Sequence, residues 1–229
     1  MIFYFVIENR IIGIIIFGIF LAGFALSISG WSKEIFLFGQ DNKISFRSIV
    51  FFVGAEIIIF GIFIISFFST RIQFAQVWKD WIPGEVNYLI VLSLTLILWA
   101  SSFTIHKAEK SVKERNLLNY RIWLILTIIL GTLFLILHIN EWIELWHKGF
   151  TISSNGYGNV FYSLTGVHAS HVVVGIIIQL ILLFNSKKSI NYIVPIKSAS
   201  FYWHFVDIAW IMVALTAYII GSQGGGLIC

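Results

Sequence analysis

The sequence predicts an all-α protein: a polytopic bundle of about six transmembrane helices that forms one domain, residues 1–229. Three observations support this fold class. Hydrophobic residues make up 59% of the chain and charged residues only 11%, which leaves too little polar surface to cover a soluble globule. The apolar runs reach the ~20 residues that a helix needs to cross a bilayer, about twice the length of a barrel strand. They also lack the alternation of polar and apolar residues that barrel strands require.

Six apolar segments follow one another along the chain, and each is long enough to be a span. Short polar connections separate them, and none of these connections has the length of a soluble domain. The predicted spans are residues 11–30, 48–69, 86–106, 122–140, 160–184 and 200–221. An even number of spans places both termini on the same side of the membrane.

The basic residues predict the orientation of this bundle. Of the 15 Lys and Arg residues, 11 lie in the first, third and fifth connections and 4 in the termini and the other connections. By the positive-inside rule, the termini face the outer side, which is the intermembrane space in a mitochondrion. This topogenic pattern also explains the formal charge of +4, and the basic residues form no aromatic-interleaved domain that would bind nucleic acid.

Several classes of chemistry have no sequence signature here. The single cysteine, Cys229, excludes an internal disulfide and a thiolate metal cluster made by this chain alone. The chain carries no glycine-rich nucleotide fingerprint and no nucleophile motif. The residues therefore favour a proton-handling transporter or a non-catalytic subunit of a larger complex, and leave both open.

Glu56 is the first candidate site, because it lies about 13 Å into the second predicted span and so close to the bilayer centre. An ionisable side chain there costs at least ~2.5 kcal/mol on insertion scales and is tolerated where it faces protein, headgroup or water. We expect Glu56 to be a protonatable group. It is either a neutral acid hydrogen-bonded to a neighbouring helix or lipid, or a site of proton exchange.

His204 and Asp207 form a second candidate, since they stand three residues apart in the last predicted span and share one helix face. They are either a satisfied pair or a functional site. His168 and His171 have the same spacing in the fifth span, among the small residues of 166–170. Small residues let another helix approach closely, which favours buried packing histidines over metal or haem ligands.

Glu141, Glu144 and His147 recur at three-residue spacing just beyond the fourth predicted span. Their place beside two tryptophans at the membrane interface favours a solvated or lipid-contacting helix end over a metal site.

Three stretches resemble subunit III of cytochrome c oxidase, the haem–copper terminal oxidase of respiration. Tyr202-Trp203-His204-Phe205-Val206-Asp207-Ile208-Ala209-Trp210 is similar to the family's Trp-His-Phe-Val-Asp signature. Residues 164–172 are similar to its Thr-Gly-x-His-x-x-His-Val motif, and residues 150–153 to its Phe-Thr-Ile-Ser loop. The resemblance runs from about residue 31 to residue 222.

The resemblance implies a non-catalytic core subunit that stabilises the catalytic subunit, binds phospholipid in a cleft and supports proton uptake during the reduction of dioxygen to water. It implies that haem a and copper belong to partner subunits and that this chain carries structural phospholipid. Glu56, His204 and Asp207 are then expected as buried protonatable or lipid-cleft residues. Residues expected in helix packing are His168, His171, Trp203, Trp210 and Glu141.

The family's mitochondrial members have seven spans, so the sequence is interpreted as a shortened form that lacks the first helix. A separate peptide is one source for that helix. The expected location is the mitochondrial inner membrane, with the plasma membrane of a bacterium that has a cytochrome c or quinol oxidase as the alternative. A stand-alone proton-coupled transporter is the alternative from another functional class.

Overall fold

The computed structural model describes residues 42–84, 87–185 and 193–223, with side chains from residue 49 onward. The chain divides into two compact units, Met1–Ser45 and Phe46–Cys229, and the second unit holds almost all of the described residues. The first predicted span, residues 11–30, lies outside the described residues.

Every regular element in the described residues is a helix. In chain order these are α3 (Asn42–Gln73), the short 3₁₀ helix η1 (Trp78–Trp81), α4 (Tyr88–Lys113), α5 (Leu117–His147), α6 (Gly156–Asn185), α7 (Ile193–Val213) and the π-helical segment η2 (Ala214–Ile220). Five helices of this part of the chain are long and apolar enough to cross a membrane. The all-α transmembrane prediction is thereby confirmed, and the five helices correspond to predicted spans two to six; the orientation of the termini stays a prediction.

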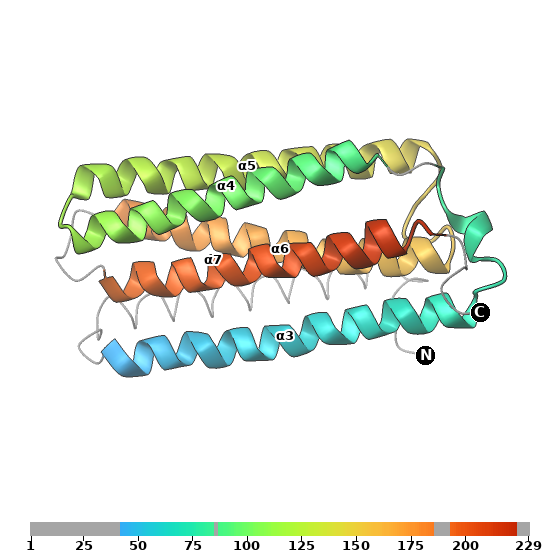
Figure 1. Ribbon diagram of the computed structural model, residues 1–229, viewed down its shortest axis with the longest axis horizontal. Coiled ribbons are helices and arrows are strands. Elements are labelled where there is room, and N and C mark those ends of the chain that lie inside the picture. The colour runs from blue at the N-terminus through green and yellow to red at the C-terminus, as the bar shows by residue number, and fades with distance from the viewer. Residues whose placement is uncertain (1–41, 85–86, 186–192, 224–229) are drawn as a thin grey trace, which may run out of the picture. The chain divides into compact units, whose positions relative to one another are not determined.

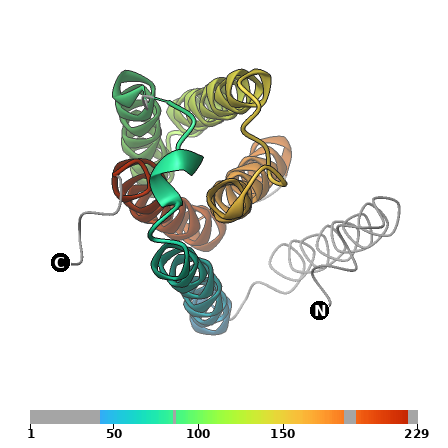
Figure 2. The same cartoon turned by 90° about the vertical axis from the view of Figure 1, so that its right-hand side faces the viewer.

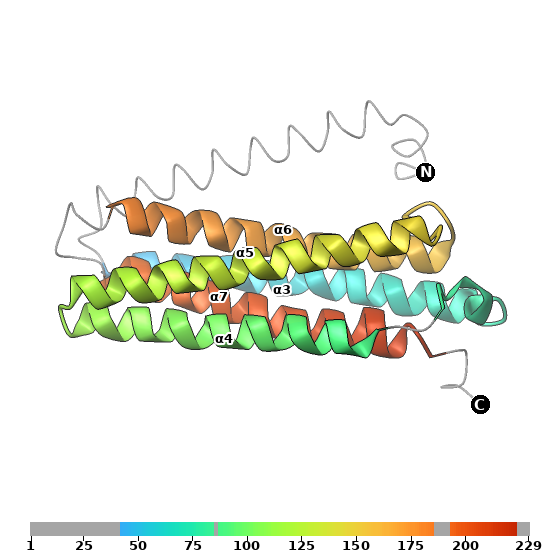
Figure 3. The same cartoon turned by 90° about the horizontal axis from the view of Figure 1, so that it is seen from above.

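The long helices run alongside one another (Figures 1 and 3). Helices α4, α5, α6 and α7 form a closed ring in which each packs against its two neighbours, and α3 lies beside α7 (Figure 2). In the most apolar window of each span, 61% of residues are buried in Ile193–Ile220, which joins α7 and η2, but only 22% in Ile49–Gln73 of α3. Within the described residues, α7 with η2 is therefore the most buried span and α3 the least.

The helices extend beyond the apolar runs that predicted them. The fourth span was predicted as residues 122–140, but α5 is Leu117–His147. It begins where the Asn116 side chain accepts from the Asn119 backbone N–H, and ends in a Schellman turn with Gly149 at φ 79°. Apolar runs mark the hydrocarbon depth, whereas capping residues fix where a helix ends.

Trp203 holds the ring of helices together. Its fully buried indole, on α7, lies against Gly131 of α5 and Gly175 of α6, and its Nε1–H donates to Oγ of Ser101 on α4 at 2.9 Å. Only a residue without a Cβ lets the rigid ring come this close. Trp203 thus contacts each of the other three helices of the ring.

Candidate functional site

Glu56 and His171 meet at the contact between α3 and α6, 115 residues apart in sequence. Oε2 of Glu56 lies 2.8 Å from Nε2 of His171, and both residues are 8% exposed. Glu56 reaches this position because it belongs to the buried stripe of α3, together with Val53 and Phe60 at spacings of three and four residues. A hydrogen bond to a neighbouring helix was one of the alternatives left open for Glu56, and the sequence did not identify His171 as the partner.

The hydrogen bonds of this pair determine how many protons it holds. Nδ1 of His171 lies 2.7 Å from the carbonyl oxygen of Val167, which only accepts, so Nδ1 carries a hydrogen. In a neutral ring Nε2 then has none, and a carboxylate would face its lone pair. The 2.8 Å hydrogen bond between Nε2 and Oε2 therefore needs one more proton, either on the carboxyl group or on Nε2. With that proton in place, the two side chains together carry no net charge.

Aromatic rings enclose this pair. The Phe60 ring lies 5.1 Å from the His171 ring and 5.9 Å from that of Phe205, measured between centroids. The Tyr202 hydroxyl donates to the His171 carbonyl at 3.2 Å. The pair is therefore surrounded by aromatic side chains of α3 and α7.

A second group of histidines continues from this site toward the η1 end of the bundle. His168, one turn from His171, is fully buried, and its ring lies 5.1 Å from that of Trp210. His138 of α5, also fully buried, lies on another side of Trp210 at 5.5 Å. Within the described residues, neither imidazole has a hydrogen-bond partner, and both rings pack among aromatic side chains.

Glu141 is buried within α5, so it does not lie at the solvated or lipid-contacting helix end that its spacing and neighbours favoured, whereas the resemblance had placed it among the packing residues. Oε2 of Glu141 accepts from the Tyr218 hydroxyl at 2.8 Å and lies 3.3 Å from Nδ1 of His138, without hydrogen-bond geometry to that nitrogen. Glu144 and His147 are exposed, in agreement with that expectation. The difference arises because α5 continues past its apolar run, so Glu141 still faces the bundle.

His204 and Asp207 are connected through Ser102 on α4. Oγ of Ser102 donates to Oδ2 of Asp207 and lies 2.9 Å from Nδ1 of His204. A serine hydroxyl has one hydrogen, so Oγ accepts from Nδ1–H of His204. The direct Nδ1–Oδ2 separation is 3.8 Å. The expected pair is therefore bridged by a serine.

The remaining predicted residue, Trp210, is fully buried, and its Nε1–H donates to Oγ1 of Thr95 at 3.0 Å. The sequence reasoning missed Ser102, His138 and Tyr218. His138 had a usable signal, because it precedes Glu141 by three residues, the spacing of the other pairs. Ser102 had no usable sequence signal, because a single serine in an apolar span is common. The described residues contain no group of three or more His, Cys, Asp or Glu side chains placed to hold a metal ion.

Fold and site together define a class: a polytopic helical membrane protein in which a buried carboxyl group of one span is hydrogen-bonded to an imidazole of another. Comparison with known proteins then gives the family. Residues 38–222 match the family described as cytochrome c oxidase subunit III, and the chain belongs to that family. The resemblance found in the sequence is confirmed.

Individual relatives have the same family name. "Probable cytochrome c oxidase subunit 3" of Nocardia farcinica is 30% identical over 197 residues, which cover 84% of this chain and 95% of the relative. "Cytochrome c oxidase subunit 3" of Bacillus subtilis is 33% identical over 189 residues, 80% of this chain and 90% of the relative. "Quinol oxidase subunit 3" of the same organism is 32% identical over 191 residues, 81% and 91% of the two chains.

These relatives bear on two predictions. All three are bacterial, so they do not support the mitochondrial location. The Nocardia relative is itself short, since 197 residues make up 95% of it. The missing first helix stays a prediction. The separate peptide stays a prediction.

Proposed function

We propose that the chain is a non-catalytic core subunit of a bacterial terminal oxidase in the plasma membrane, where it stabilises the catalytic subunit during reduction of dioxygen to water. The bacterial relatives support this location. Their names include both cytochrome c and quinol oxidases, so the proposal covers either electron donor. In this proposal haem a and copper lie in the partner subunits.

The Glu56–His171 pair carries the functional part of this proposal. A carboxyl group and an imidazole are hydrogen-bonded in a buried contact between two spans, which suits a group that exchanges protons during proton uptake. Next to Glu56, Ile57 and Ile58 are 58% and 66% exposed. Phospholipid acyl chains would cover these side chains, so the pair would lie at the edge of a lipid site.

Isolation of the chain from its native membranes tests membership of an oxidase. The visible haem spectrum and the masses of all co-purifying proteins are the measurements. An a-type haem spectrum with a large polytopic partner is the expected result. A colourless chain that purifies alone as a stable oligomer would overturn the proposal, and would make a proton-coupled transporter the leading alternative.

Glu56→Gln tests the role of the pair, because the amide keeps the shape of the side chain but cannot release a proton. We expect bound phospholipid to decrease and the oxidase to lose activity after several-fold fewer turnovers. Glu144→Gln is the matched control, since the same change is made to an exposed carboxylate. If the two variants match the unmodified oxidase equally well, the proposed role of Glu56 is wrong.

A further inference from the structure

We propose that water molecules bound inside the bundle connect the Glu56–His171 pair with the η1 end of the bundle, along His168, His138 and Glu141. The ligand of this internal site is water, and as a consequence the protons of the pair exchange with the aqueous phase at that end. Such a route is a property of this chain alone, so it goes beyond the proposed function and does not depend on it.

His138 and His168 need hydrogen-bond partners that the described residues do not supply. Both residues are 0% exposed, and in this part of the chain neither Nδ1 nor Nε2 of either ring has a partner. A neutral imidazole has one N–H donor and one acceptor nitrogen, so each ring presents two unmet positions. An unsatisfied polar group within the membrane costs several kcal/mol, so both rings require a bound partner.

Water is the ligand that suits this site. Aromatic side chains, among them Phe134, Trp142 and Trp210, enclose the two imidazoles, and full burial leaves no opening for a lipid headgroup or a side chain of another protein. Within the described ranges, Nε1–H of Trp142 is a further buried donor without a partner, and its ring lies 4.9 Å from that of His138. Water both donates and accepts, and a buried water typically makes about three hydrogen bonds to such groups.

The two histidines lie in series with the buried pair. The Phe134 ring lies 5.7 Å from each of the rings of His138 and His168, measured between centroids, so one aromatic side chain contacts both. His168 and His171 are three residues apart on α6, about 4.5 Å along the helix, and the Phe60 ring lies beside both. A water that bonds to two groups spans about 5.5 Å between them, so single waters are long enough to join neighbouring groups along α6.

Glu141 joins this series to the surface at the η1 end. Oε2 of Glu141 lies 3.3 Å from Nδ1 of His138. A groove of about 370 Å³ between α4 and α5 is lined by Glu141 and by three exposed polar residues, Ser93, Asn140 and Glu144. Water in this groove therefore reaches His138 through the Glu141 carboxyl group.

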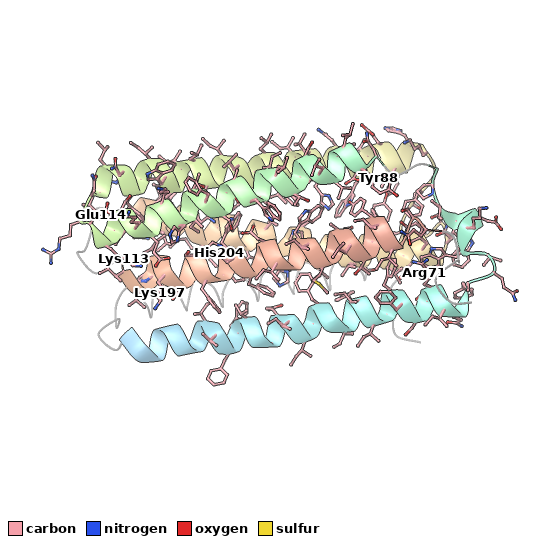
Figure 4. All side chains as sticks on the ribbon, in the orientation of Figure 1. Arg71, Tyr88, Lys113, Glu114, Lys197 and His204 are labelled. Atoms are coloured by element: carbon pink, nitrogen blue, oxygen red, sulfur yellow. The ribbon has the colours of Figure 1, made fainter. Side chains whose placement is uncertain are left out.

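The opposite direction along the bundle has a longer gap. Figure 4 shows Lys113 and Lys197 at the end of the bundle away from η1. Toward that end, Gln179 is the next buried residue of α6 whose side chain has no hydrogen-bond partner in the described part of the chain. It lies eight positions from His171, about 12 Å along the helix, whereas His168 lies about 4.5 Å away. The route through the histidines is therefore favoured.

Histidines and carboxyl groups in series suit proton transfer. A neutral imidazole accepts a proton from one water at its free nitrogen and releases its N–H proton to the next water, so one N–H bond forms as another breaks and no oxidant or reductant is needed. Both nitrogens of His171 already have partners, so the relay meets the pair at the Glu56 carboxyl group. Series of Asp, Glu and His residues inside membranes are typical of proton relays.

Solid-state NMR of the full chain in lipid bilayers measures the hydration of each ring, through transfer of magnetisation from water to the nitrogens of isotope-labelled histidine. Substitution of one histidine at a time assigns the signals. We expect His138 and His168 to receive magnetisation from water at rates comparable to that of the exposed His147, although both are buried. Absence of transfer to these two rings would show that the site is dry, which overturns the route and leaves the proposed function intact.

Exchange of the His171 ring protons with deuterated water tests the direction of the route. His138→Leu removes both ring nitrogens at similar volume, and we expect it to slow this exchange several-fold. His138→Gln keeps hydrogen-bonding groups and should restore part of the rate. His147→Leu is the matched control, because the same change is made to an exposed histidine of α5. It should leave the exchange rate unchanged.

Gln179→Leu tests the opposite direction and should also leave the rate unchanged. Slower exchange in Gln179→Leu together with an unchanged rate in His138→Leu would show that the route leads to the other end of the bundle. Equal rates in all variants would likewise refute the role of His138. Thermal unfolding of each variant checks that the bundle is intact, and the hydration of the unmodified chain decides the proposal even if His138→Leu fails to fold.

Discussion

Gly175→Ala is expected to destabilise the bundle, because the Trp203 ring occupies the space that a Cβ would need. An ideal Cβ at position 175 would lie 2.5 Å and 2.6 Å from Cζ3 and Cε3 of that ring, where ordinary carbon contacts are about 3.5–4.0 Å. The ring has no free space on its other side, since a Cβ at Gly131 would lie 2.8 Å from Cη2. The ring or helix α6 must therefore move by about 1 Å.

Overpacking of a core costs about 1–3 kcal/mol, and the tight fit of Trp203 favours the upper end of that range. Replacement of glycine by alanine within a helix returns up to about 1 kcal/mol. We therefore expect a net loss of about 2 kcal/mol in the free energy of unfolding, measured by reversible unfolding in mixed micelles. Gly61→Ala is the matched control, because nothing lies within 4 Å of its Cβ position, and it is expected to be neutral or slightly stabilising.

Trp203→Phe provides a second test of the same reasoning. The smaller ring leaves room for the added methyl group, so Gly175→Ala should cost at least 1 kcal/mol less in that background. Equal losses for Gly175→Ala in both backgrounds, or an equal loss for Gly61→Ala, would show that the contact with Trp203 does not determine the stability of this region.

Two further predictions concern the η1 end of the bundle. The Arg71 guanidinium donates to the carbonyl oxygen of Ile220 and, at 2.8 Å, to that of Gln223. Lysine cannot make both bonds with this geometry, so Arg71→Lys should speed amide hydrogen exchange after residue 220. Exchange within α4 is the control and should stay unchanged. The Tyr218 hydroxyl donates to Glu141 in the core, so Tyr218→Phe should lower the free energy of unfolding by about 1–3 kcal/mol. If this hydrogen bond is the cause, the double variant with Glu141→Gln should lose less free energy of unfolding than the sum of the two single variants.

Much of the fold could be predicted from local properties of the sequence. The apolar runs predicted spans that correspond to α3, α4, α5, α6 and α7. Helix ends were less predictable: α5 ends at the Schellman turn of Gly149, beyond its apolar run. Because the predicted span ended at residue 140, Glu141 was placed beyond it, whereas α5 continues and Glu141 lies in the core.

The candidate site was predictable only in part. Glu56, His171, His204 and Asp207 stood out because ionisable residues are costly inside a membrane. The partners of these residues could not be read from the sequence. His171 was predicted to pack rather than to bind Glu56, and nothing in the sequence indicated that Ser102 bridges His204 and Asp207.

The sequence by itself determined that the chain is a helical membrane protein and to which family it belongs, because span length, helical hydrogen bonding and a signature motif are local properties. Only the tertiary structure decided which residues meet. Core and lipid are both apolar, so the sequence of a span carries little information about the face that turns inward or the depth at which two helices pair. The hydrogen bond between Glu56 and His171, the close contact of Trp203 with two glycines and the serine bridge of His204 all depend on that rotation and depth.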